Sequence, residues 1–450
     1  MSKDIKIKKG LDINLVGEAD KVIADAPRSR TYTIKPSDFH LITPKMMVKE
    51  GAQVKTGQPI FYSREDENLK FVSPVSGTLA EIKRGAKRVI TQIIIEADGS
   101  GESVEHGILD VASADAAAIK ERLLLAGAWP FIKQRPYDII ASIDDAPDAI
   151  FISGHNSAPL APDCNFTLKG KEDALQAAVT ALGKFAQGGV HVSVEQGADS
   201  VFKNLSGITL HKVSGPHPSG NVGTQINKIR PINKGEVFWT IAAEDLVIIG
   251  ELFLTGKFNP ERIISVSGSS VKKPKYYRTR IGAEVSTFAY DAGIEGDNVR
   301  MISGNVLTGT TVAPDGSLGF YHKEFVAIPE GNDYEFFGWN KPVFNKISQT
   351  RALTFSWMFP KKKYDLDTNT NGEHRAFVLT GAYEEVFPLD IYPMQILKAC
   401  MVEDLDSMEQ MGMYEVAPED FALTEFICVS KQPHQAIIRR GLDLMQKEIG

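Results

Sequence analysis

The sequence predicts a multidomain α/β protein, and three observations support this fold class. A chain of 450 residues exceeds the size of one ordinary domain. Strand-like and helix-like segments alternate between residues 110 and 260, which is typical of a mostly parallel sheet with right-handed crossovers. Short Val- and Ile-rich runs separated by turn residues fill 47–98 and 261–330, so both stretches are expected to be β-rich.

Composition and charge exclude several functional classes. Hydrophobic residues make up 43% and charged residues 24% of the chain, as is typical of globular proteins. The net charge of −7 and the sequence pI of about 5.8 argue against general nucleic-acid binding, which needs a basic surface. Cys164, Cys400 and Cys428 are odd in number and far apart, so we expect free thiols in a reducing cytoplasm.

No targeting or membrane-spanning segment is expected. The opening residues, MSKDIKIKKG, are charged and no apolar region follows them, so they do not form a signal peptide. The most apolar window runs from Val237 to Leu254. Its carboxylates Glu244, Asp245 and Glu251 would have to enter the bilayer, which excludes a spanning helix.

Residues 1–109 are expected to form a first region that contains a barrel-sandwich. The segments VKEGAQVKTGQPIF and SPVSGTLAEI resemble the biotinyl/lipoyl-type sandwich. In carriers of that type, a lysine at a hairpin tip bears the prosthetic group. Here Lys70 stands only four residues before Pro74, so the hairpin is too short, and we expect a structural barrel without a prosthetic group.

Residues 110–260 are expected to form a Rossmann-like α/β domain. SADAAAIKERLLLAG predicts a helix with Ser113 as N-cap and Gly127 as its end. DAIFISG and VHVSV read as buried strands. KEDALQAAVTALGKFAQGG predicts a second helix that Gly188 and Gly189 close, and EVFWTIAAEDLVIIGELFLTG runs from a strand into a helix.

This α/β region lacks the usual nucleotide-binding motifs. A dinucleotide fingerprint places glycines where the backbone approaches the pyrophosphate at a helix N-terminus. No G-x-G-x-x-G follows a strand here, and no G-x-x-x-x-G-K-[ST] is present. The loop AGAWPF, Ala126 to Phe131, has one glycine and a bulky tryptophan, which favours packing over phosphate binding.

The last two predicted regions are a β-grasp module and a helical end. RIISVSG, YYRTRIG, VRMISG and LGFYHKEFVAI place four strands in residues 261–330. Residues 331–450 become helical after 388, where LDIYPMQILKACMVED and HQAIIRRGLDLMQKEI space apolar residues at three and four.

Metal and nucleophile motifs are weak. His211 and His217 are six residues apart in a Pro/Gly loop, but zinc needs three or four ligands, so we expect two exposed histidines and no metal site. His155 and Cys164 flank NSAPLAPD. A thiol–imidazole pair can form a nucleophile, but nothing else in the pattern supports one.

Two segments combine aromatic and basic residues. KKPKYYRTR, Lys272 to Arg280, is expected to be an exposed strand or partner face rather than a nucleic-acid track. SWMFPKKKYD places apolar anchors beside lysines, which suits a membrane surface or a membrane-bound partner; the alternative is a loop packed onto the core. The docking candidates are Trp357, Met358, Phe359, Lys361, Lys362 and Lys363.

Long segments along the whole chain carry a family resemblance. They include GLDINLVGEAD, VKEGAQVKTGQPIF, GPHPSGNVGTQINKIRPINKGEVFWTI and GEHRAFVLTGAYEEVFPLDIYP. The chain resembles the alpha chain, NqrA, of the bacterial sodium-translocating NADH:quinone oxidoreductase (Na⁺-NQR). The resemblance implies a six-subunit complex of the inner bacterial membrane that oxidises NADH, reduces ubiquinone or menaquinone and exports sodium.

The same resemblance implies the place of this chain in the complex. The alpha chain is peripheral, on the cytoplasmic face, and docks on the membrane subunit NqrB. It carries no redox cofactor, because FMN, FAD, riboflavin and iron–sulfur groups belong to other subunits. A role near the quinone is also implied, and the aromatic candidates for it are Trp129 and Phe131; their alternative role is core packing.

The chain also resembles the NADH-binding flavoprotein of complex I and the RnfC protein of the Rnf complex. Where the flavoprotein has a glycine-rich loop and carboxylates, this sequence has AGAWPFIKQ and then His155, Asn156 and Ser157, so we expect that its flavin site is lost. A [4Fe–4S] cluster needs four thiolates. Cys428 is kept, Thr424 stands where a second cysteine would be, and the region resembles a remnant of an iron–sulfur domain.

The sequence therefore favours a cofactor-free subunit of a redox-driven sodium pump. It names no catalytic, cofactor-binding or metal-ligating residue, because electron transfer here would need a cofactor that the chain is not expected to bind. Two alternatives stay open: a stand-alone ligand-binding protein that uses the β-grasp module, and a flavin-dependent NADH oxidoreductase.

Overall fold

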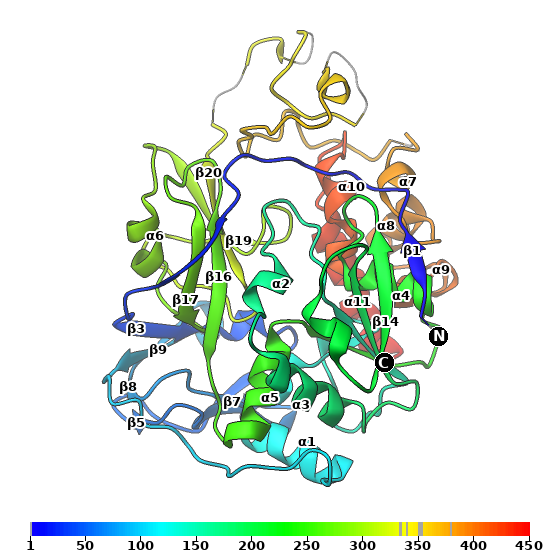
Figure 1. Cartoon of the computed structure of the whole chain (residues 1–450). Helices are drawn as coiled ribbons and strands as arrows, with labels where there is room; N and C mark the ends of the chain where they lie inside the picture. Colours follow the sequence, from blue (N-terminus) through cyan, green and yellow to red (C-terminus); the bar gives the residue numbers. More distant parts are fainter. Residues whose placement is uncertain (1, 333–334, 339–340, 350–353, 379) are drawn as a thin grey trace.

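Four β-sheets organise the chain in the computed structural model (Figure 1). The structure describes residues 2–332, 335–338, 341–349, 354–378 and 380–450. The N-terminal residues contribute to more than one sheet. Strand β1 (Asp4–Lys6) joins the sheet of the predicted α/β region and β2 (Asp20–Asp25) joins that of the β-grasp region, so residues 1–109 do not form one continuous sheet unit. The region boundaries at 109, 260 and 330 stay predictions.

Two small sheets form the predicted barrel-sandwich. The first has the order β3 (Thr31–Ile34), β9 (Ile90–Ala97), β8 (Gly77–Arg84), β5 (Gln53–Val54). The second has the order β4 (Pro44–Met46), β6 (Pro59–Ser63), β7 (Asp66–Val72). Phe61 and Phe71 stack in the core with ring centroids 4.5 Å apart. Lys70 lies inside β7 opposite Tyr62, not at the turn.

A seven-stranded sheet forms the α/β region. Five neighbouring strands are parallel, and two short antiparallel strands extend one edge. In spatial order the strands are β1 (Asp4–Lys6), β14 (Ile208–Ser214), β13 (Val190–Glu195), β12 (Ala149–Ser153), β15 (Phe238–Ala242), β10 (Lys133–Arg135) and β11 (Ile139–Ile140).

Three helices of this region, α1 (Ala116–Leu125), α3 (Glu172–Leu182) and α5 (Asp245–Thr255), match predicted helices except at their ends. Two more, α2 (Cys164–Thr167) and α4 (Val222–Ile229), were not predicted. The predicted N-cap Ser113 is wrong, because Asp115 caps α1 by accepting from the Ala118 amide at 2.8 Å. Gly188 and Gly189 do not close α3, which ends at Leu182; they form the turn before β13.

A six-stranded sheet forms the β-grasp region. Its order is β19 (Thr310–Thr311), β18 (Val299–Ser303), β20 (Glu324–Pro329), β16 (Glu261–Ser267), β17 (Lys275–Arg280), β2 (Asp20–Asp25). Helix α6 (Ser286–Ala292) packs Phe288 against the core residue Phe325. The prediction of an exposed strand at Lys272–Arg280 is wrong, since β2 covers the outer edge of β17 and Tyr276 and Tyr277 are buried.

Helices dominate the chain after residue 388, where α8 (Pro393–Met401), α9 (Leu405–Gln410), α10 (Ala422–Phe426) and α11 (His434–Glu448) follow one another. The short helix α7 (Tyr383–Val386) comes just before them. Cys400 and Cys428 are buried in their shared core. The Cys428 thiol contacts the Tyr383 hydroxyl at 2.9 Å, and Thr424 contacts His434 Nδ1 at 2.9 Å. Ordinary side chains therefore fill the space around these positions.

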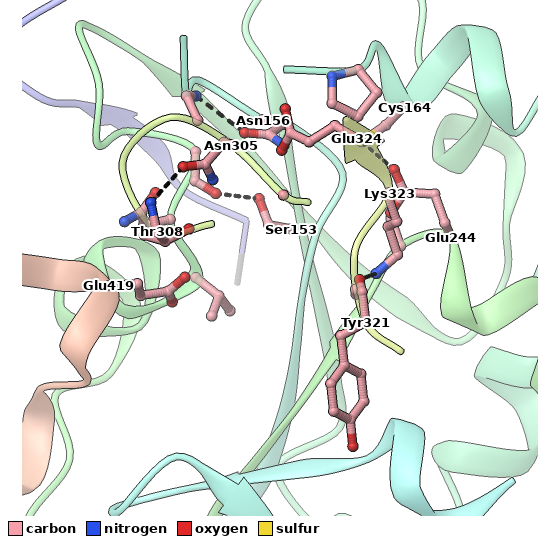
Figure 2. Close-up of a pocket in the computed structure, with 18 of the residues that line it drawn as sticks. Ser153, Asn156, Cys164, Glu244, Asn305, Thr308, Tyr321, Lys323, Glu324 and Glu419 are labelled. Carbon is pink, nitrogen blue, oxygen red and sulfur yellow. Dashed lines mark hydrogen bonds between the residues drawn. The ribbon is translucent and has the colours of Figure 1, made fainter. Parts of the chain in front are cut away.

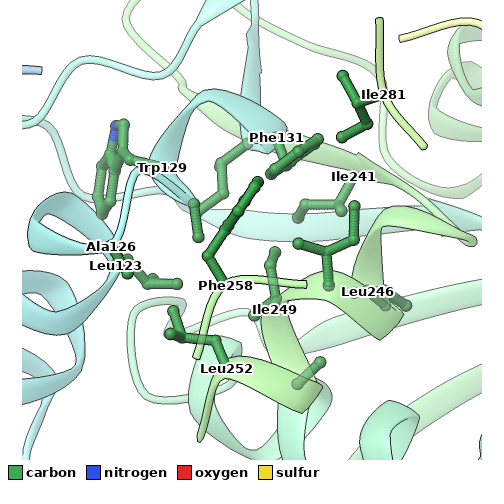
Figure 3. Close-up of a cluster of buried hydrophobic side chains, with 14 of the residues drawn as sticks. Leu123, Ala126, Trp129, Phe131, Ile241, Leu246, Ile249, Leu252, Phe258 and Ile281 are labelled. Carbon is green, nitrogen blue, oxygen red and sulfur yellow. The ribbon is translucent and has the colours of Figure 1, made fainter. Parts of the chain in front are cut away.

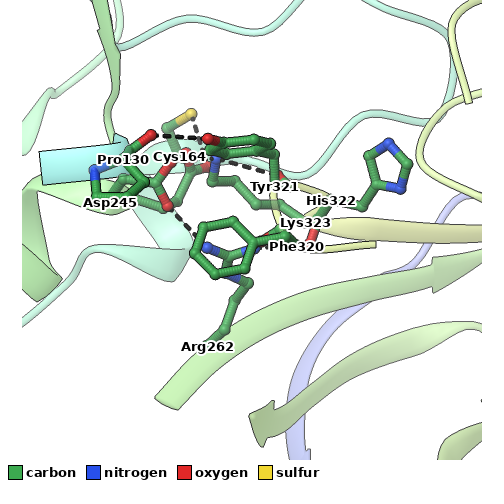
Figure 4. A network of polar contacts seen from close by, with 9 residues as sticks. Pro130, Cys164, Asp245, Arg262, Phe320, Tyr321, His322 and Lys323 are labelled. Atoms are coloured by element: carbon green, nitrogen blue, oxygen red, sulfur yellow. Dashed lines mark hydrogen bonds and ion pairs between the residues drawn. The ribbon is translucent and has the colours of Figure 1, made fainter. Parts of the chain in front are cut away.

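A buried ion-pair network joins the α/β and β-grasp regions (Figure 4). Arg262 on β16 donates to Asp245 Oδ1 at 2.9 Å, and Lys323 donates to Asp245 Oδ2 at 3.0 Å. Arg262 also donates to the carbonyls of Phe320 and His322. Because both charges of the Arg262–Asp245 pair are nearly fully buried, the pair holds the start of α5 against the neighbouring sheet.

No helix in the described part of the chain is both long and apolar enough to cross a membrane.

Candidate functional site

The topology of the seven-stranded sheet predicts where a ligand can bind. From β12 the chain moves outward through β13 and β14, and then returns to place β15 on the other side of β12. In open α/β sheets, ligands bind outside the carboxyl ends of the strands at such a reversal. The strands β12 and β15 end side by side at Ser153 and Ala242.

A cleft of about 310 Å³ lies at this point. Three regions build it, because residues of the β-grasp sheet and Glu419 from the C-terminal region face the ends of β12 and β15 (Figure 2). The β-grasp wall consists of the loop after β18 and the start of β20. The polar side chains that the figure labels are Ser153, Asn156, Cys164, Glu244, Asn305, Thr308, Tyr321, Lys323, Glu324 and Glu419.

The cleft is acidic where a nucleotide-binding protein would bind phosphate. Helix α5 follows β15 directly, and its N-terminal residues Glu244 and Asp245 line the cleft. A helix N-terminus attracts anions, but here these two carboxyl groups already occupy that position. Arg262 and Lys323 compensate the charge of Asp245, whereas the partner of Glu244 is the uncharged Cys164 thiol. A phosphate at this helix end would therefore meet the Glu244 carboxylate, which disfavours its binding.

Glu324 is a buried carboxyl group that faces the cleft. The residue is 6% exposed, and its Oε2 atom has no hydrogen-bond partner among the described residues. Burial, and next the nearby charge of Glu244, raise the pKa of Glu324 to about 8. The carboxyl group is therefore mostly protonated at neutral pH, and its unpaired oxygen can donate or accept a hydrogen bond.

Two histidines of the cleft are neutral. Burial lowers the pKa of His155, and it lowers that of His217 to about 4. His217 Nδ1 contacts the Ser157 hydroxyl at 3.0 Å. His211 lies elsewhere, on β14, where its Nε2 contacts His191 Nδ1 at 3.0 Å. The prediction that His211 and His217 are exposed is wrong, because both are buried. His211 lies on β14, which β1 covers, and His217 lies in the Pro/Gly loop, which packs onto the domain.

His155 and Cys164 do not form a nucleophilic pair. Both line the cleft, but the Cys164 thiol donates to Glu244 Oε1 at 3.4 Å, and His155 Nε2 lies 3.4 Å from the Ser219 hydroxyl. Burial and the charge of Glu244 raise the pKa of Cys164 well above its usual value. A thiol in this setting is a weak nucleophile. In the described ranges, no three His, Cys, Asp or Glu residues are arranged to hold a metal ion.

The structure separates the two aromatic candidates (Figure 3). Phe131 lines the cleft but is 2% exposed and belongs to the same hydrophobic core as Trp129; its ring stacks on Phe320 with centroids 5.1 Å apart. Trp129 is 1% exposed and lies in the core, where its indole N–H donates to the Ala141 carbonyl at 2.8 Å and its ring packs edge-on against Trp239. Gly127, just before it, approaches Val72 so closely that a Cβ atom would lie 2.3 Å from a methyl group. The loop Ala126 to Phe131 is therefore part of the packed core.

The docking candidates lie in the segment that follows β20, at one end of the molecule (Figure 1). Trp357 and Met358 are each 53% exposed, and Phe359 is 46% exposed. Lys361, Lys362 and Lys363 are exposed beside them. Lys362 donates to the Phe344 carbonyl at 2.7 Å, and Lys363 pairs with Glu18 at 2.7 Å, so the segment is tied to its surroundings.

The sequence did not reveal that Glu244 and Glu324 line the cleft. Glu244 interrupts the most apolar window of the chain. This charged residue was used only to exclude a membrane span, although its position at a strand–helix junction could also have indicated a site. Glu324 sits between aromatic and apolar residues in YHKEFVAI, where a charged residue facing inward is unusual. Only the pairing of β20 with β16 and β18 brings Glu324 to the cleft.

Family models match three parts of the chain. The NqrA N-terminal barrel-sandwich hybrid domain matches residues 5–98, the NqrA second alpha/beta domain matches 114–258, and the NQRA C-terminal domain, an SLBB domain, matches 263–313. These matches confirm the predicted barrel-sandwich and SLBB-like module. Among solved structures, a chain of an NAD⁺-reducing [NiFe]-hydrogenase aligns over 77% of this chain and 73% of its own, with 13% identity and a TM-score of 0.38, too low to support an argument.

Curated relatives match over the full length. The NqrA chain of the Na(+)-translocating NADH-quinone reductase of Neisseria meningitidis serogroup A is 36% identical, covering 99% of this chain and 100% of its own. The NqrA chains of Saccharophagus degradans and Vibrio atlanticus are each 34% identical with the same coverage. The chain therefore belongs to the NqrA family, whose members are subunits of the Na⁺-translocating NADH-quinone reductase.

Proposed function

We propose that this chain is the cofactor-free, peripheral NqrA subunit of a complex that couples NADH oxidation and quinone reduction to sodium export. The observation that carries the proposal is the similarity to curated NqrA chains over 99% of this chain and 100% of each relative. The proposal places the chain on the cytoplasmic face of the bacterial inner membrane, docked on the membrane subunit NqrB, with ubiquinone or menaquinone as the electron acceptor of the complex.

The chemistry of the cleft supports the absence of a flavin or NADH site. Glycines that would allow a phosphate to approach the backbone are used for packing instead: Gly127 contacts Val72, and a Cβ atom on Gly220 would lie 2.4 Å from the Ser157 amide nitrogen. The carboxyl groups of Glu244 and Asp245 occupy the start of α5. In this proposal the α/β region is Rossmann-like, and the C-terminal helices derive from an iron–sulfur domain that no longer has its ligands.

We assign docking to the segment 356–363. Its three exposed apolar side chains precede three exposed lysines, an arrangement that combines burial of apolar surface with attraction to anionic groups at a membrane or a membrane protein. We place Phe131 near the quinone, because it lines the cleft. Trp129 lies in the core, where it contributes to the packing of the loop that carries Phe131.

Docking is tested by charge reversal in the native membrane. The triple variant K361E/K362E/K363E of the tagged chain is extracted in mild detergent, and co-purification of the flavin-bearing membrane subunits is measured. We expect the wild type to retain these subunits and the variant to lose most of them. The control reverses Lys83, Lys87 and Arg88, which are exposed on the β8–β9 hairpin.

The same preparation tests the other parts of the proposal. Sodium-stimulated NADH:quinone activity in the purified complex, with no flavin or iron on the isolated chain, is the expected result. Recovery of a lone protein from native membranes would favour the stand-alone ligand binder. Flavin or iron on the isolated chain would contradict the cofactor-free assignment.

A further inference from the structure

A row of buried polar side chains crosses the β-grasp sheet and ends at the cleft. Ser265 on β16 lies opposite Glu324 on β20 and, on its other side, opposite Tyr276 on β17. Residues that pair across neighbouring strands point to the same face of a sheet, and their backbones are about 4.8 Å apart. All three residues are buried, so the row runs through the interior of the protein rather than over its surface.

Two members of this row have polar atoms without a protein partner. Glu324 Oε2 and Ser265 Oγ are buried and have no hydrogen-bond partner among the described residues. Buried polar groups are nearly always hydrogen-bonded, and internal waters bond those that lack protein partners. The opposite face of the same strands is different, because Ile264, Val266 and Phe325 form an apolar core there. The polar face is therefore the one suited to hold a chain of hydrogen bonds.

The other end of the row reaches a second, outer crevice. The Tyr276 hydroxyl accepts the Asp163 amide at 3.0 Å, just before α2, so its own hydrogen can be donated elsewhere. Asp163 forms an ion pair with Lys21, whose side chain is 62% exposed. Both residues line a crevice of about 480 Å³, which shares residues of the segment 155–164 with the cleft. Solvent therefore reaches this end of the row.

Each group of the row can give and take a proton. A hydroxyl group donates one hydrogen bond and accepts others, as a protonated carboxyl group does. Burial, and next the charge of Glu244, raise the pKa of Glu324 to about 8, close enough to neutrality for the group to exchange protons in both directions. Burial also raises the pKa of Tyr276. Tyr276 and Ser265 therefore stay neutral and pass protons along hydrogen bonds.

We propose that Tyr276, Ser265 and Glu324 form a buried proton relay, completed by internal water, between the outer crevice and the cleft. Its use in catalysis rests on the function proposed above, because reduction of a quinone to a quinol takes up electrons from NADH and an equal number of protons. Glu324 gives its proton toward the cleft, and its carboxylate takes one from the Ser265 side. Each hydroxyl then receives a proton from the member behind it, and Tyr276 receives one from water in the crevice. One proton has then crossed the protein, and every member of the row is restored.

Exchange of the Glu324 proton with solvent tests the relay directly. It is measured on the isolated full-length chain by rapid mixing into D₂O at pH 7 with infrared detection. The carbonyl stretch of a protonated carboxyl group shifts on deuteration, and the band that E324Q lacks is that of Glu324. We expect S265A and Y276F each to slow this exchange about tenfold or more, because each removes a hydroxyl group from the route.

Two further variants separate the relay from a general effect on the fold. S265T keeps the hydroxyl group and should exchange within about threefold of the wild type. Ser267 is also buried without a hydrogen-bond partner among the described residues, two positions along the same strand. It lies opposite Val326 and therefore outside the row, so S267A should also stay within about threefold of the wild type.

Turnover of the assembled complex tests the catalytic use of the relay. We expect S265A to co-purify with the membrane subunits and to lower kcat for quinone reduction about threefold or more, with little change in KM. The ratio of the rates in H₂O and D₂O should increase in the same variant, because proton transfer then limits the rate. S265T should restore both values.

The possible failures can be told apart. Equal exchange rates in the wild type, S265A and Y276F would overturn the relay, because Glu324 would then exchange directly through the cleft. An S267A protein as slow as S265A would overturn it too, since the effect would not follow the row. Slow exchange with unchanged turnover would overturn only the catalytic use. Failed co-purification of the wild type with the membrane subunits would contradict the proposed function and leave the exchange test on the isolated chain valid.

Discussion

The buried ion pair between Arg135 and Asp420 is expected to hold the C-terminal region onto the α/β sheet. Arg135 Nη1 donates to Asp420 Oδ2 at 2.8 Å, and the two side chains are 1% and 0% exposed. Asp420 also accepts the Ala417 amide at 2.8 Å. In the variant Asp420→Asn the guanidinium stays buried while its carboxylate partner becomes neutral, so we expect a large loss of stability.

The structure sets the size of this effect. Removing one partner of a buried ion pair costs about 3–5 kcal/mol, because the remaining charge is left without compensation. Here Arg135 keeps a second partner, Glu419, at 2.8 Å, but that carboxylate is 41% exposed and screened by water. The loss for D420N should therefore lie near the lower limit, about 3 kcal/mol. The double variant R135M/D420L removes both charges and should recover part of the loss.

Urea unfolding with a probe in the C-terminal helices measures the change, provided that the transition of that region is cooperative. The matched control is D25N, which breaks the exposed ion pair of Asp25 with Arg278 and should cost less than about 1 kcal/mol. A D420N protein within about 1 kcal/mol of the wild type, or a double variant less stable than the single one, would contradict the stabilising role of the Arg135–Asp420 pair.

Lowering the pH is expected to destabilise the protein through His211, which is buried with a pKa of about 4. The unfolded chain takes up a proton near pH 6.5, so the free energy of unfolding should fall between about pH 6.5 and 4, by at most about 1.4 kcal/mol per pH unit for this group; H211N should show a smaller slope. The variant Gly250→Ala would place a Cβ atom 1.8 Å from the Ala174 carbonyl oxygen where α5 crosses α3. It should cost at least about 1–3 kcal/mol in thermal or urea unfolding, whereas G85A, which meets only the Thr91 methyl group, should not.

Local patterns in the sequence predicted much of the secondary structure. The apolar spacing of residues 116–125 and 172–182 and the runs that became β12 and β15 needed no long-range information, because periodicity is a property of neighbouring residues. Capping was less predictable. Ser113 and Asp115 are both good N-cap residues, and the choice between them depends on where Ile119 and Leu123 meet the core.

The same patterns did not predict which side chains are exposed to solvent. The YYRTR strand and the histidine loop look polar, yet Tyr276, Tyr277, His211 and His217 are buried. Their burial comes from partners distant in the sequence: β2 covers β17, and β1 pairs with β14. Residues close together in the sequence do not show whether a strand is covered by another strand from elsewhere in the chain.

Residues close together in the chain were enough to predict the regular elements and the absence of nucleotide-binding motifs, and long ordered matches were enough to establish the resemblance over the full chain. The candidate site, in contrast, depends on tertiary contacts. Glu244 and Glu324 come from different regions and meet because the reversal between β12 and β15 opens a space that β20 closes. Their chemistry follows from this shared burial, and burial is a property of the folded chain rather than of any segment.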